Sequence, residues 1–139
     1  MFKALVVDAQ GGGLGASIVK SLKEKYADRI EIIALGTNAI ATTTMHKAGA
    51  NACATGENAI CFNVRCADVI LGGIGIIAAN SMMGEISPSV ANAVAESDAE
   101  KILIPISKCN ILIPGTSVMN AKDMIEAATD SIAPLLERA

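Results

Sequence analysis

The sequence is poor in aromatic residues and has no cluster of positive charge. Among its 139 residues only Phe2, Tyr26 and Phe62 are aromatic, and its formal net charge is −3. Proteins that bind nucleic acid stack bases on aromatic rings and neutralise phosphates with grouped Lys and Arg side chains. With neither feature present, the sequence argues against nucleic acid as the main partner.

The sequence also lacks the patterns of a metal centre or a catalytic triad. It contains one histidine, His46, and no C-x-x-C pair among Cys53, Cys61, Cys66 and Cys109. Zinc is usually held by several Cys or His ligands at characteristic spacings, so we expect no bound metal. His46 falls on a predicted helix without an identifiable partner, which argues against a Ser/His/Asp arrangement. We interpret the cysteines as small, buried side chains in a reducing cytoplasm.

No apolar run approaches the roughly 20 residues that cross a membrane, and we therefore expect no membrane association. The N-terminal MFKALVVDAQ has no long apolar core and no small-residue cleavage site, so we interpret it as a first strand in a cytoplasmic protein. Because no linker or repeat interrupts the chain, residues 1–139 are expected to form one domain. Hydrophobic residues still make up 52% of the sequence. This high hydrophobic content, which comes mainly from Ala, Ile and Val, is typical of a sheet covered on both faces.

Short apolar runs alternate with helical patterns along the chain. The runs predict strands at Ala4–Val7, Ile30–Leu35, Asn51–Ala54, Asp68–Leu71, Lys101–Ile106 and, as a last edge strand, Ile111–Ile113. Apolar periodicity and capping residues predict helices from Leu14 to Leu22, from Asn38 to about Ala48, from Asn58 to Cys66, from Ser87, and from about Asn120 with a restart at Pro134. This alternation predicts an α/β fold, a Rossmann-like three-layer sandwich with a mostly parallel sheet.

A strand order of 3-2-1-4-5 would make the strands that end at Asp8 and Gly72 neighbours. Ligands of such sheets bind where the strand order reverses, outside the carboxyl ends of the strands. Gly11–Gly15 follows the first of these strands, and Gly72–Gly75 follows the other. Both glycine turns are therefore expected to face one cleft.

The first glycine turn partly matches a dinucleotide-binding motif. Gly11-x-Gly13-x-x-Ala16 fits the relaxed pattern G-x-G-x-x-G/A. The acidic residue expected after the second strand is missing, because Gly36-Thr37-Asn38 stands there, and the P-loop pattern fails at Ala16-Ser17. We predict a nucleotide or another phosphate-bearing ligand. A purely structural turn and a different small molecule remain alternatives.

Several residues are candidates for this site. Those predicted to bind the ligand, with a nucleotide or dinucleotide as a possible cofactor, are Gln10, Gly11, Gly12, Gly13, Gly15, Thr37, Asn38, Gly72 and Gly75. Those with suitable chemistry for catalysis are Asp8 and Glu57 as general bases and Lys108 as an electrostatic stabiliser. Asp8 is unfavourable beside a bare phosphate unless a cation or a donor offsets it. Glu57 and Glu85 have plainer roles available, at a helix N-terminus or in solvent. A β-carbon at Gly13 is expected to obstruct the ligand and to penalise any positive φ there.

The segments DAQGGGLG, LGTNAIATTTMHKAGAN, ATGENAI, ADVILGGIGI, GEISP and ILIPISKCN occur together over nearly the whole chain. This set resembles a small uncharacterised bacterial family known as a domain of unknown function. The resemblance implies a Rossmann-like fold and a stand-alone cytoplasmic protein, and it implies no activity. Gly73 departs from the proline that the resemblance leads us to expect.

Three kinds of function are compatible with these features: a binding protein for a nucleotide or phosphorylated metabolite, a small enzyme acting on such a metabolite, and an oligomeric accessory protein without a ligand. The scarcity of histidine and the absence of an activated nucleophile favour binding. The apolar excess, the predicted edge strand Ile111–Ile113 and the apolar segment Ile76–Met83 also predict a homo-oligomer, most simply a dimer.

Overall fold

The computed structural model describes residues 1–106 and 110–139, so that the candidate residue Lys108 lies outside the described residues, as does Cys109. A five-stranded sheet has the order β3-β2-β1-β4-β5, and all of its pairs are parallel. The strands are β1 Phe2–Asp8, β2 Ile30–Gly36, β3 Ala52–Thr55, β4 Val69–Gly73 and β5 Glu100–Ile104. This is the 3-2-1-4-5 order, in which β1 and β4 are neighbours.

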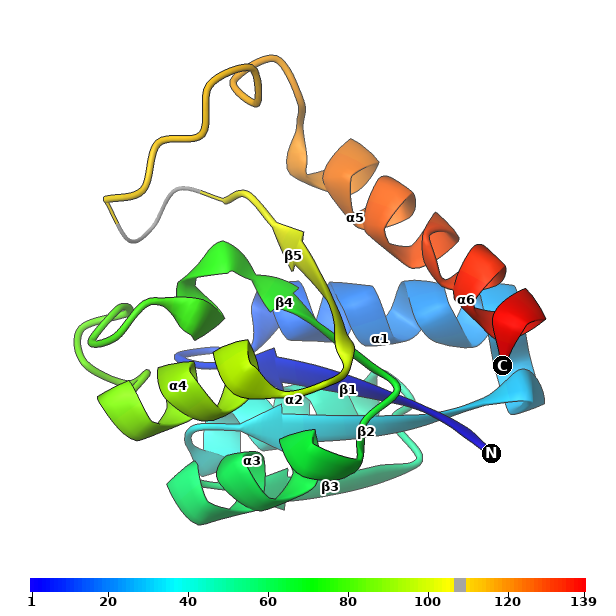
Figure 1. Cartoon of the computed structure of the whole chain (residues 1–139), viewed down its shortest axis with the longest axis horizontal. Helices are drawn as coiled ribbons and strands as arrows, with labels where there is room; N and C mark the ends of the chain where they lie inside the picture. Colours follow the sequence, from blue (N-terminus) through cyan, green and yellow to red (C-terminus); the bar gives the residue numbers. More distant parts are fainter. Residues whose placement is uncertain (107–109) are drawn as a thin grey trace.

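Helices cover both faces of the sheet, which confirms the predicted three-layer, Rossmann-like sandwich (Figure 1). On one face lie α1 Gly13–Tyr26, α2 Ala39–Lys47, α5 Ala121–Asp130 and α6 Ile132–Arg138. On the other lie α3 Glu57–Asn63 and α4 Pro88–Glu96. Short 3-10 turns follow α1, α3 and β4, at η1 Ala27–Arg29, η2 Val64–Cys66 and η3 Ile74–Ile77. Within the described ranges, no helix is both long and apolar enough to span a bilayer.

The helices α2 and α4 begin directly after the capping residues that the sequence predicted for them. The Asn38 side chain accepts a hydrogen bond from the Ala41 amide (2.9 Å), and the Ser87 hydroxyl accepts one from Val90 (3.2 Å). These bonds satisfy amides that the first turn of a helix leaves without a partner. Pro134 lies in the first turn of α6, where its missing N–H costs nothing, and α5 ends at Asp130 before it.

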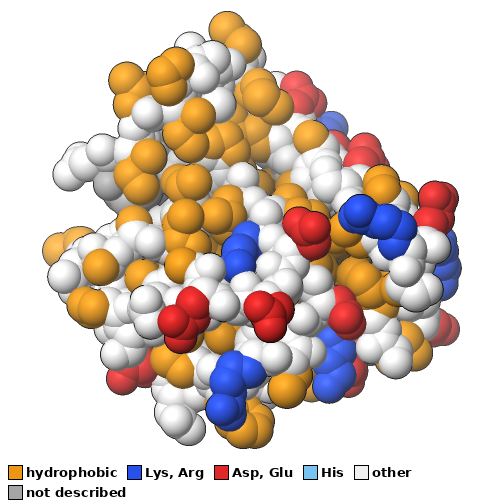
Figure 2. All heavy atoms as spheres, in the orientation of Figure 1, with side chains coloured by type: hydrophobic (Ala, Val, Ile, Leu, Met, Phe, Trp, Pro, Cys, Tyr) orange, Lys and Arg blue, Asp and Glu red, His pale blue; other side chains and the backbone are white. Residues whose placement is uncertain are grey.

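The predicted edge strand at Ile111–Ile113 is wrong. This segment has no ladder partner among the described residues, and it belongs to an irregular stretch, residues 110–120, that arches away from the sheet between β5 and α5 (Figure 1). Asn110 has a left-handed backbone (φ 56°), and Pro114 has no amide to donate, so the run between them is too short to extend a sheet. Hydrophobic side chains gather on the surface over this part of the molecule (Figure 2).

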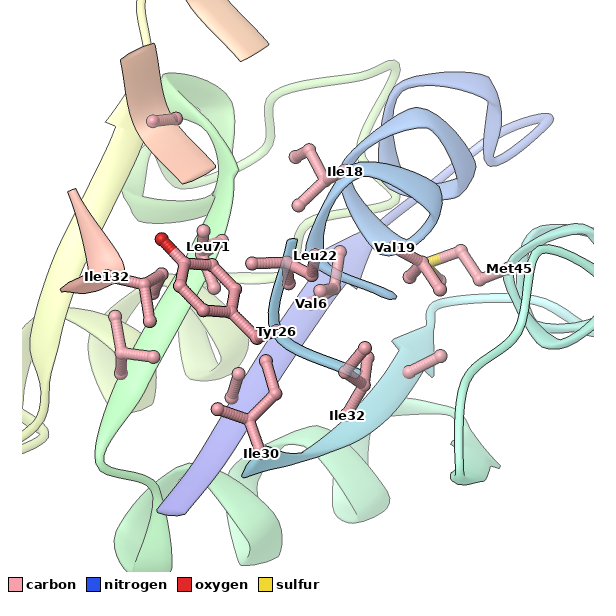
Figure 3. Close-up of a cluster of buried hydrophobic side chains, with 14 of the residues drawn as sticks. Val6, Ile18, Val19, Leu22, Tyr26, Ile30, Ile32, Met45, Leu71 and Ile132 are labelled. Carbon is pink, nitrogen blue, oxygen red and sulfur yellow. The ribbon is translucent and has the colours of Figure 1, made fainter. Parts of the chain in front are cut away.

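The core divides into two clusters, one on each face of the sheet. Along β1, Ala4 and Val6 join the cluster beneath α1, α2 and α5, whereas Leu5 and Val7 join the cluster beneath α3 and α4. Figure 3 shows the first cluster, in which side chains of α1 pack onto the strands. Because successive strand residues point to opposite faces, a sheet buried on both sides requires continuous apolar runs.

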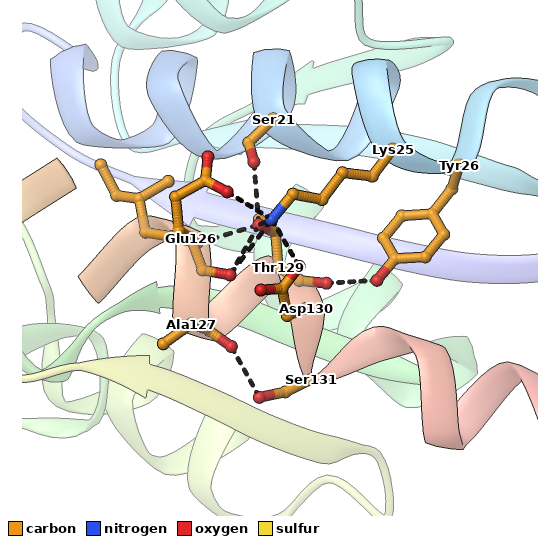
Figure 4. A network of polar contacts seen from close by, with 9 residues as sticks. Ser21, Lys25, Tyr26, Glu126, Ala127, Thr129, Asp130 and Ser131 are labelled. Carbon is orange, nitrogen blue, oxygen red and sulfur yellow. Dashed lines mark hydrogen bonds and ion pairs between the residues drawn. The ribbon is translucent and has the colours of Figure 1, made fainter. Parts of the chain in front are cut away.

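A polar network joins α5 to α1 around Thr129, whose side chain is fully buried (Figure 4). Its hydroxyl lies 2.8 Å from the hydroxyl of Ser21 and 2.8 Å from Lys25 Nζ. The Tyr26 hydroxyl donates to the Thr129 carbonyl (2.5 Å). Lys25 also forms ion pairs with Glu126 (2.9 Å) and Asp130 (2.7 Å). These contacts position α5, whose first half forms one wall of the site described next.

Candidate functional site

The loop between β1 and α1 is a tight turn with two left-handed residues. β1 ends at Asp8, Gln10 and Gly12 have φ angles of 51° and 75°, and α1 begins at Gly13. The Gly12 amide donates to the carbonyl of Ala9 (3.1 Å). The helix N-terminus is thereby placed at the carboxyl end of the central strand, where ligands of parallel sheets bind.

The glycines of this loop have two different roles. A β-carbon on Gly12 would lie 2.7 Å from the Ala41 carbonyl oxygen, and one on Gly15 would lie 2.5 Å from Met45 Sδ. These two glycines are buried and allow α2 and Asp8 to pack closely. Gly11 and Gly13 are exposed, and a β-carbon on either would meet nothing within 4 Å. The left-handed glycine of the loop is Gly12, so a positive φ does not penalise a side chain at Gly13.

Asp8 is a buried cap for α1. Its carboxylate accepts hydrogen bonds from the amides of Ala9 (2.8 Å) and Gly15 (2.7 Å), and only 6% of the residue is exposed. A negative charge in this place is stabilised by the positive end of the helix dipole. Among the described residues, the amides of Gly11, Gly13 and Leu14 have no acceptor. The loop therefore offers donors that an anionic ligand can use.

A cleft of about 510 Å³ opens beside this loop. Both glycine turns contribute to it, the first through Gly11–Gly13 and the second through Gly73 and Gly75. The full lining is Asp8, Ala9, Gln10, Gly11, Gly12, Gly13, Leu14, Ser17, Gly73, Gly75, Met82, Ile106, Ala121 and Ile125. One end of the cleft thus carries backbone amides, and the wall formed by Leu14, Met82, Ile106 and Ile125 is apolar.

Four predicted ligand-binding residues lie outside that lining. Gly15 packs against Asp8 and Met45, as described above. Gly72 lies inside the sheet, where a β-carbon would be 2.8 Å from the Val7 carbonyl oxygen. Thr37 and Asn38 also do not line the cleft, because their side chains donate to a residue for which the sequence predicts only a capping role or a solvated position.

That residue is Glu85, in the segment between η3 and α4. Its Oε1 atom accepts three hydrogen bonds, from the Gln10 amide (2.9 Å), the Thr37 hydroxyl (2.7 Å) and Asn38 Nδ2 (2.9 Å). The bond from Gln10, followed by those from Thr37 and Asn38, lowers the pKa of Glu85 despite its partial burial. No local spacing signals this role, because the partners are 47 to 75 residues away in the sequence.

Glu57, the second candidate base, lies elsewhere on the carboxyl edge. It is exposed and accepts a hydrogen bond from the Ser87 hydroxyl (2.5 Å), which joins the first turns of α3 and α4. It does not line the cleft. Of the three candidate catalytic residues, Asp8 alone is therefore found at the cleft among the residues that the structure describes.

Two expectations about His46 and the cysteines are wrong. His46 does have a partner, because its Nδ1 atom lies 3.3 Å from Cys53 Sγ, and both residues are exposed. Cys53 stands on the uncovered edge strand β3, and Cys66 is also exposed. Among the three cysteines that the structure describes, only Cys61 is partly buried, and burial, followed by the charge of Glu57, raises its pKa. In the described ranges, no three His, Cys, Asp or Glu side chains are grouped to hold a metal ion.

Comparisons with known proteins complete the description of the site. A family model described as "Domain of unknown function (DUF3842)" matches residues 3–137, which agrees with the resemblance seen in the sequence. No curated protein matches the chain significantly. A solved structure, "An arsenate reductase in the phosphate binding state", is 13% identical with a TM-score of 0.45, over 99% of this chain and 98% of that one. That likeness is too distant to assign any residue.

Proposed function

The chain belongs to the DUF3842 family, whose function is unknown, and we propose that it binds a nucleotide or another phosphorylated small metabolite in the cleft beside the β1–α1 loop. The observation that carries this proposal is that two of the loop glycines are required by packing and two are not. Packing explains Gly12 and Gly15, but nothing in the described protein requires the missing side chains of Gly11 and Gly13. A ligand that approaches the backbone closely would require them.

The donors beside these glycines fit an anion. The amides of Gly11, Gly13 and Leu14 are without an acceptor among the described residues, and they stand at the positive end of α1. The Asp8 carboxylate accepts a hydrogen bond from the Gly15 amide and not from the amides of Gly11, Gly13 and Leu14. The donors of Ala9 and Gly15 hold the Asp8 carboxylate as an acceptor, an arrangement that favours a capping role over that of a general base. Binding without chemistry is therefore the function that we propose.

We also propose that the protein is a cytoplasmic homodimer. Several large apolar side chains are exposed near the carboxyl end of the sheet: Met83 (96%), Leu112 (84%) and Val118 (90%). Large apolar side chains left in solvent often mark an interface. The free thiols of Cys53, Cys61 and Cys66 suit a reducing compartment.

The proposed function is tested by Gly13→Val, which adds a side chain at an open, exposed position where the protein itself offers no obstacle. The variant should fold and lose the ligand. A compound at a hundred times its dissociation constant stabilises a protein by about 2.7 kcal/mol, a shift that thermal unfolding detects easily. The panel comprises inorganic phosphate, nucleotides, dinucleotides, coenzyme A and sugar phosphates.

The matched control is Ser89→Val, at an exposed first-turn position of α4 away from the cleft, which should keep the wild-type response. If no compound stabilises the wild type, the proposal is wrong. If Gly13→Val responds as the wild type does, the glycines form a structural turn only.

A further inference from the structure

The cleft is open on one side of the β1–α1 loop and closed on the other. In related folds a dinucleotide crosses the N-terminus of the first helix, and an acidic residue after the second strand holds the adenosine ribose. Here the side chains after β2 are Thr37 and Asn38, and Glu85 engages both. Asn38 Nδ2 also donates to the Gln10 carbonyl (3.0 Å).

Glu85 therefore engages the side chains after β2, where an acidic residue would hold a ribose in such folds. Its carboxylate reaches from the segment after η3 and ties the β1–α1 loop to the β2–α2 loop through one oxygen atom. The donors with which this crevice would recognise a sugar are already satisfied by the protein. A dinucleotide would have to break these three hydrogen bonds before its adenosine half could enter.

The open side of the cleft suits a different kind of molecule. Its wall consists of Leu14 from α1, Met82 from the segment after η3, Ile106 beyond β5 and Ile125 from α5. Away from the β1–α1 loop, Ser17 supplies the one polar side chain in the described lining, and no aromatic ring contributes to it. A nucleoside would leave ribose hydroxyls and base edges without partners against this wall, whereas an aliphatic group loses no hydrogen bonds there.

We propose that the ligand is a phosphate monoester of a small aliphatic alcohol, and not a dinucleotide or a nucleoside phosphate. The phosphate lies on the amides of Gly11, Gly13 and Leu14, and the aliphatic body lies against Met82, Ile106 and Ile125. This inference rests on the proposed function, because it assigns a chemical class to the ligand of the same cleft.

Isothermal titration of the full chain with butyl phosphate, inorganic phosphate, AMP and NAD tests the inference. We expect butyl phosphate to bind at least about tenfold more tightly than inorganic phosphate, because its chain is removed from water against the apolar wall. AMP and NAD should bind more weakly than butyl phosphate. In Ile125→Ala the advantage of butyl phosphate should shrink several-fold while the affinity for inorganic phosphate is kept. Ile40→Ala, at a 70% exposed position of α2, should behave as the wild type does.

The outcomes separate the two proposals. If AMP or NAD equals or exceeds butyl phosphate, the inference is overturned and the proposed function stands. If butyl phosphate and inorganic phosphate bind equally well, or if Ile125→Ala leaves their ratio unchanged, the aliphatic body is not recognised and the inference is again overturned. If none of the four compounds binds, the inference is overturned, and the wider panel described above decides the proposed function.

Discussion

At the scale of single residues, Glu85 is the side chain on which the shape of the site depends most. One of its oxygens holds three donors from two loops, and hydrogen bonds to an ionised acceptor are stronger than those to a neutral one. Asp8 acts in a similar way on the other side, where its carboxylate fixes the amides of Ala9 and Gly15. Two carboxylates thus shape a loop whose ligand we propose to be an anion, and the hydrogen bonds they accept offset their charge.

Replacing Glu85 by Gln tests the contribution of its charge to stability. The folded-state pKa is lowered from its ordinary value of 4.5, so the unfolded chain takes up the proton first as the pH falls. The stabilisation is complete above that ordinary value and is lost as the pH falls through the folded-state pKa. Glu85→Gln should therefore be less stable than the wild type by about 1 kcal/mol at pH 7, with the difference vanishing in acid. Urea unfolding across this pH range measures it.

The control for this series is Glu24→Gln, because Glu24 is exposed on α1 and accepts no hydrogen bond from the residues that the structure describes. Its stability should follow that of the wild type at every pH. A constant difference between Glu85→Gln and the wild type from neutral to acid pH would contradict the role given to the charge.

At the scale of elements, the position of α5 decides whether the cleft has an outer wall. Ala121 and Ile125 of this helix line the cleft, and the network around Thr129 holds the helix on α1 (Figure 4). Burial lowers the pKa of Lys25, but its hydrogen bonds to Asp130 and Glu126 outweigh this and raise it. Lys25 therefore stays charged at neutral pH and can serve as the central donor of the network.

Thr129→Val keeps the shape of the side chain and removes the hydroxyl that contacts Ser21 and Lys25. Because Ser21 and Thr129 are buried, Ser21 loses a hydrogen bond that water cannot readily replace, and we expect a loss of about 1–3 kcal/mol in the free energy of unfolding. Thr44→Val is the matched control. The Thr129 hydroxyl donates to the Ile125 carbonyl (2.9 Å), and Thr44 likewise donates to the carbonyl four residues earlier (2.9 Å), but among the described residues Thr44 bonds to no other element. Equal losses in the two variants would show that the tertiary contacts contribute nothing.

At the scale of the whole molecule, the irregular segment 110–120 leaves apolar side chains in solvent. Leu112 and Val118 are among the most exposed, and Figure 2 shows hydrophobic side chains gathered over this part of the surface. Since Ile111–Ile113 is not a strand, a dimer cannot form by pairing this segment as a sheet edge. Self-association through segment 110–120 would therefore bury its apolar side chains and would not extend the sheet.

Val118→Asp tests that form of self-association. The wild type should sediment at micromolar concentration with twice the monomer mass, and the variant should sediment as a monomer, because a charge at the centre of an apolar contact is costly to bury. Ile40→Asp places the same charge at another exposed apolar position and should leave the dimer intact. A wild type that is monomeric at this concentration would contradict the dimer, and a dimeric Val118→Asp would place the interface elsewhere.

The sequence alone determined the alternation of five strands with helices, although it also predicted an edge strand at Ile111–Ile113 that does not form. Continuous apolar runs require a sheet covered on both faces, and residues such as Asn38 and Ser87 cap helices by contacts within four positions. These signals are local, so they can be recognised without a structure. The glycine-rich loop after β1 is also a local signal that the sequence shows by itself.

Only the tertiary structure decided what each residue of the site does. The loop glycines differ in role because α2 approaches Gly12 and Gly15 and leaves Gly11 and Gly13 open. Glu85 reaches Gln10 across 75 positions, and this contact closes the side of the cleft where a dinucleotide motif predicts a ribose. Neither fact follows from spacing or composition, because each depends on which distant segments the folded chain brings together.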